Sequence, residues 1–160
     1  MANDALATYL NDHLAGSVVA LELLEHLEAE RPGSAGAPIL ATVRADIETD
    51  RDTLEQLMAR LEIGVSRPRQ ATAWVTEKVG ELKLRIDDPE QGALRRLEAL
   101  ETISLGIEGK RGLWEALRAA SDGVPSLGEL DYPGLIRRAA DQRAVVERLR
   151  LQAATDALGD

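Results

Sequence analysis

Cysteine and phenylalanine are both absent from this chain of 160 residues, which also has only two histidines, two tryptophans and two tyrosines. Without cysteine the chain can form no disulfide, no thiolate metal site and no cysteine nucleophile. A core without phenylalanine must be built from Leu, Ile, Val and Ala. Ala, Leu, Glu and Arg dominate the composition, and all four favour helices. These features predict an all-α fold.

No apolar run approaches the roughly 20 residues that span a bilayer, and the start Met-Ala-Asn-Asp lacks the pattern of a secretory signal. We therefore expect a cytoplasmic protein with no membrane partner. The net charge is −9, and Lys and Arg are interspersed with Asp and Glu. Nucleic-acid binding needs clustered basic residues, so we expect no nucleic-acid partner.

Turn-forming residues divide the chain into two pairs of long helices within a single domain, 1–160. The first break is R-P-G-S-A-G-A-P (31–38), which cannot continue a helix. Amphipathic patterns flank it and predict hairpin one over residues 3–62, with helices at 3–30 and 38–62. Two long helices joined by a short loop must run antiparallel.

Hairpin two is predicted over residues 89–158. Its first helix follows a capping box at Asp88-Pro89-Glu90-Gln91 and continues to about Ala120. A break at 121–125 precedes a last helix over about 133–157.

The two hairpins are separated by a crossover, residues 63–88. We expect Gly64 to end the second helix, and 70–85 to form a short helix interrupted by Gly80. An up-down-up-down bundle needs only a short second loop. The long crossover instead favours a ferritin-like four-helix bundle.

The second helix of each hairpin carries a related stretch, D-R-D-T-L-E-Q-L (50–57) and Q-R-A-V-V-E-R-L (142–149). In both stretches, a polar residue followed by arginine lies near the middle of the helix. This pair interrupts the apolar seam, the row of apolar residues that we expect to face the bundle interior. Polar residues of the other two helices occur at a similar height. We therefore expect a central polar layer, either structural or a degenerate site, made of His13, Ser17, Asp50, Arg51, Glu101, Ser104, Glu108, Gln142 and Arg143.

Di-metal bundles use a Glu from each of two helices and Glu-x-x-His from each of the other two. Here both histidines, His13 and His26, lie on the first helix, so the full ligand set is absent. A Glu-x-x-His motif that began at Glu48 would place its histidine ligand at position 51. Arg51 occupies that position instead, and arginine does not bind metals. We predict no cofactor. Glu22 and His26, at i and i+4, are the alternative candidates for a divalent metal.

Three glycines, Gly106, Gly109 and Gly112, follow one another at three-residue spacing in the third long helix. Each costs about 1 kcal/mol relative to alanine inside a helix, so the spacing suggests a role. We expect close packing against a neighbouring helix or a partner subunit, and the alternative is a kink or a small cavity. Surplus apolar residues on the first helix also need cover, either from the 70–85 segment or from a second subunit. We expect a homodimer.

The stretches Y-L-N-D-H-L-A-G-S-V-V-A-L-E-L-L-E-H-L (9–27) and L-E-A-L-E-T-I-S-L-G-I-E-G-K-R-G-L-W-E-A-L (97–117) resemble an uncharacterised group of bacterial ferritin-like proteins. The resemblance covers the two hairpins. It implies a ferritin-like bundle, carries no known activity, and transfers no metal site to this chain.

Three functional hypotheses follow. The first is a non-catalytic bundle that acts as an interaction or stress-related protein, since the chain has no identifiable Ser-His-Asp set and no Gly-x-Ser-x-Gly elbow. The alternative is a degenerate metal-binding or oxidoreductase bundle that uses His13 or the Glu22/His26 pair. The third is a small-ligand pocket lined by Trp74 or Trp114.

Overall fold

The computed structural model describes residues 4–66, 77 and 92–159, and this part is all-helical, with four α-helices and no strand. The all-α prediction is confirmed for these residues. None of the helices in the described part is long and apolar enough to cross a membrane. The elements are α1 (Asp4–Glu30), α2 (Ala37–Arg60), α4 (Gly92–Ala120), the 3₁₀ helix η1 (Pro125–Leu127) and α5 (Tyr132–Leu158).

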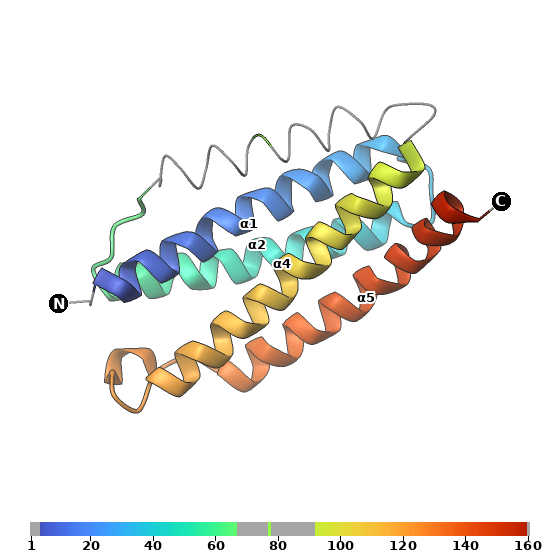
Figure 1. The fold of residues 1–160 in the computed structure, drawn as a ribbon. Helices are drawn as coiled ribbons and strands as arrows, with labels where there is room; N and C mark the ends of the chain where they lie inside the picture. Colours follow the sequence, from blue (N-terminus) through green and yellow to red (C-terminus); the bar gives the residue numbers. More distant parts are fainter. Residues whose placement is uncertain (1–3, 67–76, 78–91, 160) are drawn as a thin grey trace.

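The four helices lie side by side along most of their length (Figure 1). α1 and α2 run in opposite directions and are joined by a short loop. α4 and α5 also run in opposite directions, and the loop between them contains η1. α1 packs on α2 and α4, while α5 packs on α4 and α2. Each helix therefore has two antiparallel neighbours, and α2 and α4 point the same way.

The predicted helix ranges agree with the described helices to within about two residues at the ends of α1, α2 and α5, and at the end of α4. The loop 31–38 breaks the chain as its two prolines require. The short helix predicted over 70–85, with its interruption at Gly80, lies outside the described residues except for Glu77. The capping box at 88–91 lies outside them as well.

The prediction that Gly64 ends the second helix is wrong, because α2 already ends at Arg60. Glu62 takes the left-handed conformation, with φ of 56°, in the position that glycine usually occupies. The N–H of Glu62 donates to the carbonyl of Ala59 at 3.1 Å, and the N–H of Ile63 donates to that of Met58 at 2.9 Å. These two bonds form a Schellman motif that closes the helix without glycine.

Asn11, a buried residue of α1, fixes the chain where it leaves α2. Its side-chain N–H group donates to the carbonyl of Gly64 at 3.2 Å, and its oxygen accepts from the N–H of Ser66 at 2.7 Å. A buried amide needs such partners, since leaving it unpaired costs about 1–3 kcal/mol.

α5 begins with a side-chain cap and a buried tyrosine. The Asp131 carboxylate accepts from the N–H of Gly134 at 3.0 Å, and Pro133 occupies the first turn, where its missing N–H costs nothing. The Tyr132 hydroxyl donates to the carbonyl of Leu127 at 2.6 Å. This bond ties the η1 loop to the start of the helix.

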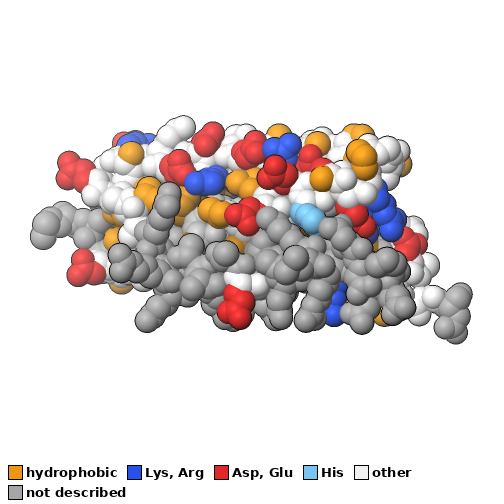
Figure 2. Space-filling model, turned by 90° about the horizontal axis from the view of Figure 1, so that it is seen from above, with side chains coloured by type: hydrophobic (Ala, Val, Ile, Leu, Met, Phe, Trp, Pro, Cys, Tyr) orange, Lys and Arg blue, Asp and Glu red, His pale blue; other side chains and the backbone are white. Residues whose placement is uncertain are grey.

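The surface of the described helices carries both signs of charge in alternation, as Figure 2 shows for one face. Many of these charges form ion pairs: Arg44 contacts Glu28 at 2.8 Å, and Arg111 contacts Glu115 at 2.6 Å. Surface pairs of this kind contribute little to stability, typically below about 1 kcal/mol.

The apolar core consists of two clusters placed one after the other along the bundle. The first includes Leu24 of α1, Val43 and Ile47 of α2, and Ile107 of α4. The second includes Leu14, Leu54, Leu113, Trp114 and Leu135. In α1, α2 and α4 the nearest members of the two clusters are almost two helical turns apart, and the candidate site lies in that interval.

Candidate functional site: a buried ionic layer and its pocket

α1, α2 and α4 each place a polar side chain between the two apolar clusters, and α5 places Gln142 between Ala139 and Val146 of the first cluster. Along α2 the apolar seam reads Val43, Ile47, Leu54 and Leu57, and Asp50 occupies the position between Ile47 and Leu54. The other residues at this level are Ser17 of α1, Lys110 of α4 and Gln142 of α5. Because these positions face the bundle interior, their polar groups must find partners there.

The Asp50 carboxylate is the centre of this layer, and its side chain is only 1% exposed. The Lys110 ammonium group donates to its Oδ2 atom, and the Arg138 guanidinium group donates to Oδ1. The side-chain amide of Gln142 donates to Oδ2 at 3.0 Å, while its oxygen accepts from Lys110. Side chains from α2, α4 and α5 therefore meet at one carboxylate, and we call Asp50, Lys110, Arg138 and Gln142 the buried ionic layer.

Two cations share one carboxylate in the buried ionic layer. Burial lowers the pKa of Lys110 below its usual value, and the adjacent Asp50 carboxylate opposes that shift. Arg138 lowers the pKa of Lys110 further, since a second cation disfavours the first. A second carboxylate, Asp46 of α2, raises the pKa of Lys110 through its charge, so two cations and two carboxylates act at this level.

Asp50 and Gln142, which occupy equivalent positions in the two related stretches, are brought together as predicted. Lys110 and Arg138 were missed by the sequence reasoning. Lys110 has a recognisable signal, because it lies on the α4 seam between Ile107 and Trp114, both fully buried.

The expectation that Glu101, Ser104, Glu108 and Arg143 lie at the bundle centre is wrong for the charged members. Arg143 lies on the flank between α4 and α5, with its side chain 41% exposed, and contacts Glu108 at 3.4 Å. We call the following network the α4–α5 flank: Glu101, Ser104, Glu108, Arg143, Glu147 and Arg150. Ser104 is itself buried and donates its hydroxyl proton to Glu147.

Arg51 and Arg143 do not meet. Each comes directly after a seam residue in the sequence, so it lies about 100° further around the helix and points away from the bundle interior. Arg51 pairs with Glu55 of its own helix at 2.9 Å. The half-buried Ser17 hydroxyl donates to the carbonyl of Leu14 at 2.6 Å. His13 packs edge-on against the ring of Tyr9, and burial lowers its pKa.

No group of three or more His, Asp or Glu side chains in the described ranges is placed to hold a metal ion. The Glu22/His26 pair of α1 is therefore not completed by a third such side chain from 4–66 or 92–159. At Asp50, a metal ion would have to replace the two cations that already occupy the carboxylate.

A pocket of about 200 Å³ opens beside the buried ionic layer, between α1, α2 and α4. Asp50 and Lys110 form its buried polar end, and its other polar lining residues are Asp12, His13, Ser17 and Arg51. Its apolar walls come from Ile47, Leu54, Ile107, Leu113 and Trp114.

Gly16, Gly106 and Gly109 also line the pocket. A methyl group added at any of them, or at Gly112, would meet no atom of the described structure within 4 Å. Close packing of these glycines against a neighbouring helix is therefore not seen in the described part. Close packing against a partner subunit stays a prediction.

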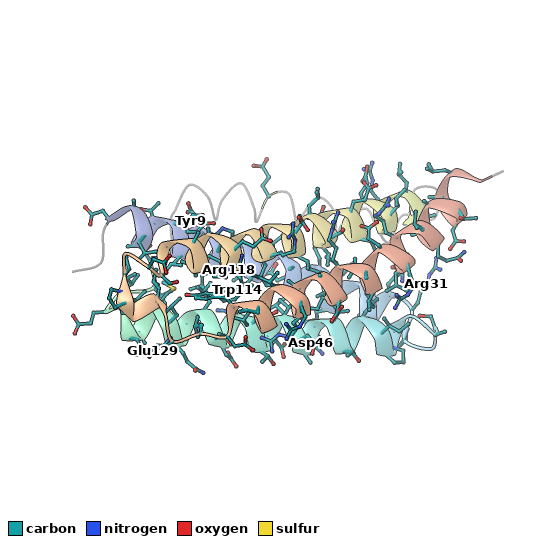
Figure 3. All side chains as sticks on the ribbon, turned by 90° about the horizontal axis from the view of Figure 1, so that it is seen from below. Tyr9, Arg31, Asp46, Trp114, Arg118 and Glu129 are labelled. Carbon is teal, nitrogen blue, oxygen red and sulfur yellow. The ribbon has the colours of Figure 1, made fainter. Side chains whose placement is uncertain are left out.

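Trp114 lies inside the bundle, whereas Glu129 and Arg31 lie at its two ends (Figure 3). The indole is 1% exposed, and its Nε1 atom is buried without a hydrogen-bond partner in the described part. A buried donor of this kind is unusual and costs about 1–3 kcal/mol. The surrounding side chains therefore enclose this donor without pairing it within the described part.

Comparison with known proteins does not place the chain in a family: no family model, curated protein or solved structure matches it.

Proposed function

We propose that this chain is a non-catalytic ferritin-like four-helix bundle, a cytoplasmic protein that acts through contacts with partners, as interaction or stress-related proteins do. The observation that carries the proposal is the occupation of Asp50 by Lys110, Arg138 and Gln142. Metal-using bundles place carboxylates and histidines at this level. Here two cations and an amide hold the one carboxylate.

The order of helix directions supports the ferritin-like part of the proposal. α1 and α2 form one antiparallel pair, α4 and α5 form the other, and α2 and α4 run parallel (Figure 1). Such an order needs a connection between α2 and α4 as long as the bundle, and 31 residues separate Arg60 from Gly92. A ferritin-like bundle has one long crossover of this type.

The homodimer is supported by leucines that remain uncovered on the second helix pair. Leu105 of α4 is 69% exposed, and Leu151 and Leu158 of α5 are 58% and 69% exposed. Burying a leucine side chain contributes about 1.5–3 kcal/mol. A second copy of the chain that covered these residues would gain that free energy.

The metal-binding alternative is tested by elemental analysis of protein purified from medium supplemented with iron, manganese and zinc. We expect each metal to be present at far less than one ion per chain. One ion per chain, lost in His13→Ala or His26→Ala but retained in a variant of a distant surface residue such as Glu129→Ala, would overturn the proposal in favour of a degenerate metal site.

The oligomeric state is tested separately by sedimentation equilibrium at micromolar concentration. We expect a dimer of the 17.3 kDa chain, and we expect Leu105→Glu with Leu151→Glu to shift it to monomer. A monomer in the unmodified protein contradicts the dimer but leaves the bundle-centre argument intact.

A further inference from the structure

We infer that the pocket beside the buried ionic layer is a binding site for a compact aromatic monocarboxylate. The inference goes beyond the proposed function, which assigns no ligand. It depends on three observations: the size and walls of the pocket, the unused donor at its inner end, and the glycines that keep it open.

The size of the pocket fits a single ring with a small substituent. An apolar cavity of about 150 Å³ in another protein accommodates benzene. The pocket here measures about 200 Å³, and Ile47, Leu54, Ile107 and Leu113 supply its apolar walls. Trp114 adds an aromatic surface, against which a second ring packs favourably.

At the inner end of the pocket, the polar group that can still form a hydrogen bond is a donor, the Lys110 ammonium group. An ammonium group has three protons, and Lys110 gives two of them to Asp50 and Gln142. One Lys110 proton is therefore left for an occupant of the pocket. The Asp50 carboxylate already accepts from three donors, so it does not compete for a further one.

The charge of the Lys110 ammonium group favours an anion over a neutral acceptor. The Lys110 side chain is 15% exposed, and it is the basic side chain of the buried ionic layer that lines the pocket. In surroundings this dry, a carboxylate gains more from a cation than it would in water. The pocket lining includes one further carboxylate, Asp12, but that residue is exposed, so water and salt screen its charge.

Glycine in place of larger residues explains how the space arises. Gly106 and Gly109 of α4 and Gly16 of α1 all line the pocket, and a Cβ atom added at any of them would meet no described atom within 4 Å. Glycine inside a helix is unfavourable, so three of them at one pocket come at a cost in stability. A binding site that needs space for an aromatic ring explains why glycine is present at these positions despite that cost in stability.

The test uses benzoate as the probe and benzyl alcohol as the neutral molecule with the same ring. In a Trp74→Phe background, Trp114 is the only tryptophan, so its fluorescence reports on the pocket. At constant ionic strength, we expect a saturable response to benzoate with an affinity about tenfold higher than that for benzyl alcohol, as one charge-assisted hydrogen bond provides. A response that is linear, or equal for the two molecules, would overturn the inference.

Two matched leucine substitutions separate binding from folding. Gly109→Leu fills the pocket, whereas Gly112→Leu adds the same side chain outside it, and neither new Cβ atom meets a described atom. Both should fold at least as stably as the parent, because leucine favours helix over glycine. Only Gly109→Leu should abolish benzoate binding, and equal binding by the two variants would refute the site.

Lys110→Met tests the charge, since methionine keeps the length of the side chain. Calorimetric titration should show benzoate losing its roughly tenfold advantage while benzyl alcohol binds as before. If Lys110→Met fails to fold, the Gly109→Leu and Gly112→Leu pair still decides the location of the site, and the benzoate-to-benzyl alcohol ratio decides its charge preference.

Discussion

The buried ionic layer and the α4–α5 flank are built from the same kinds of side chain, yet they differ in their exposure to water. In the buried ionic layer the Asp50 side chain is 1% exposed and Lys110 is 15% exposed. On the flank, Glu108 and Arg143 are 36% and 41% exposed. Both networks join neighbouring helices, so the comparison isolates the effect of burial.

Burial changes what each network does for the fold. On the flank, water screens the charges, and a broken pair is simply rehydrated. In the interior, a cation that loses its partner remains in a dry environment and destabilises the native state strongly. Replacing a buried pair by apolar side chains can be neutral, so the buried ionic layer sets which helices meet at this level more than it adds stability.

The largest effect is expected for Asp50→Leu, which removes the only carboxylate of the buried ionic layer. Lys110 would lose its anionic partner while staying buried, so the unfolding free energy should fall by about 3–5 kcal/mol. Urea denaturation followed by circular dichroism measures this change. A loss below about 1 kcal/mol would place Asp50 in the same class as the flank residues.

A pH titration should distinguish Lys110 from ordinary lysines. Its native pKa lies below 10.5, the value for an unperturbed lysine, because burial disfavours the charged form. Between the native pKa and 10.5 the unfolded chain binds more protons, so the contribution of Lys110 to the unfolding free energy rises with pH. Urea melts of the parent and Lys110→Met over this range should diverge in that direction, and parallel curves would contradict the shift.

On the flank, the contribution of Glu147 to the unfolding free energy also rises with pH, but it does so at acid pH. Hydrogen bonds from Arg150, and then from Ser104, lower its pKa below 4.5. Its stabilising contribution is therefore complete above pH 4.5 and is lost as the pH falls through the native pKa. Glu147→Gln should cost up to about 1 kcal/mol at pH 7, and the difference from the parent should vanish in acid. A difference that persists at low pH would show that the effect is not electrostatic.

The smallest effect is expected for Arg143→Ala. Its side chain is 41% exposed and contacts Glu108 at 3.4 Å, so the unfolding free energy should fall by less than about 0.5 kcal/mol. The loss should also shrink in 1 M salt, since screening weakens exposed pairs. A larger loss, insensitive to salt, would mean that the flank is drier than its exposure indicates.

The helical part of the fold was predictable because helix formers, prolines and loop glycines act locally. The loop 31–38 and the start of α5 at Asp131 follow directly from that chemistry. The end of α2 did not follow, because Glu62 adopts a left-handed conformation that no local residue signal indicates. The burial of Ile63 in the core and the bonds between Asn11 and residues 64 and 66 hold that turn.

The candidate site was only half predictable, for a geometric reason. Seam spacing identified Asp50 and Gln142, because each replaces an apolar residue in a regular series. The same spacing would have identified Lys110. Arg138 lies beside the seam and reaches Asp50 through its long side chain, so only the three-dimensional structure reveals it. Arg51 and Arg143 are neighbours of seam residues in sequence, but the helix turns them outward.

A double-mutant cycle between Asp50 and Lys110 tests the central claim most directly. The variants are Asp50→Leu, Lys110→Met and the two combined, with unfolding free energies from urea denaturation. If these side chains form a buried pair, the double variant should recover much of the stability that Asp50→Leu loses, giving a coupling energy of at least about 1.5 kcal/mol. Strictly additive losses would contradict a buried ionic layer at the centre of the bundle.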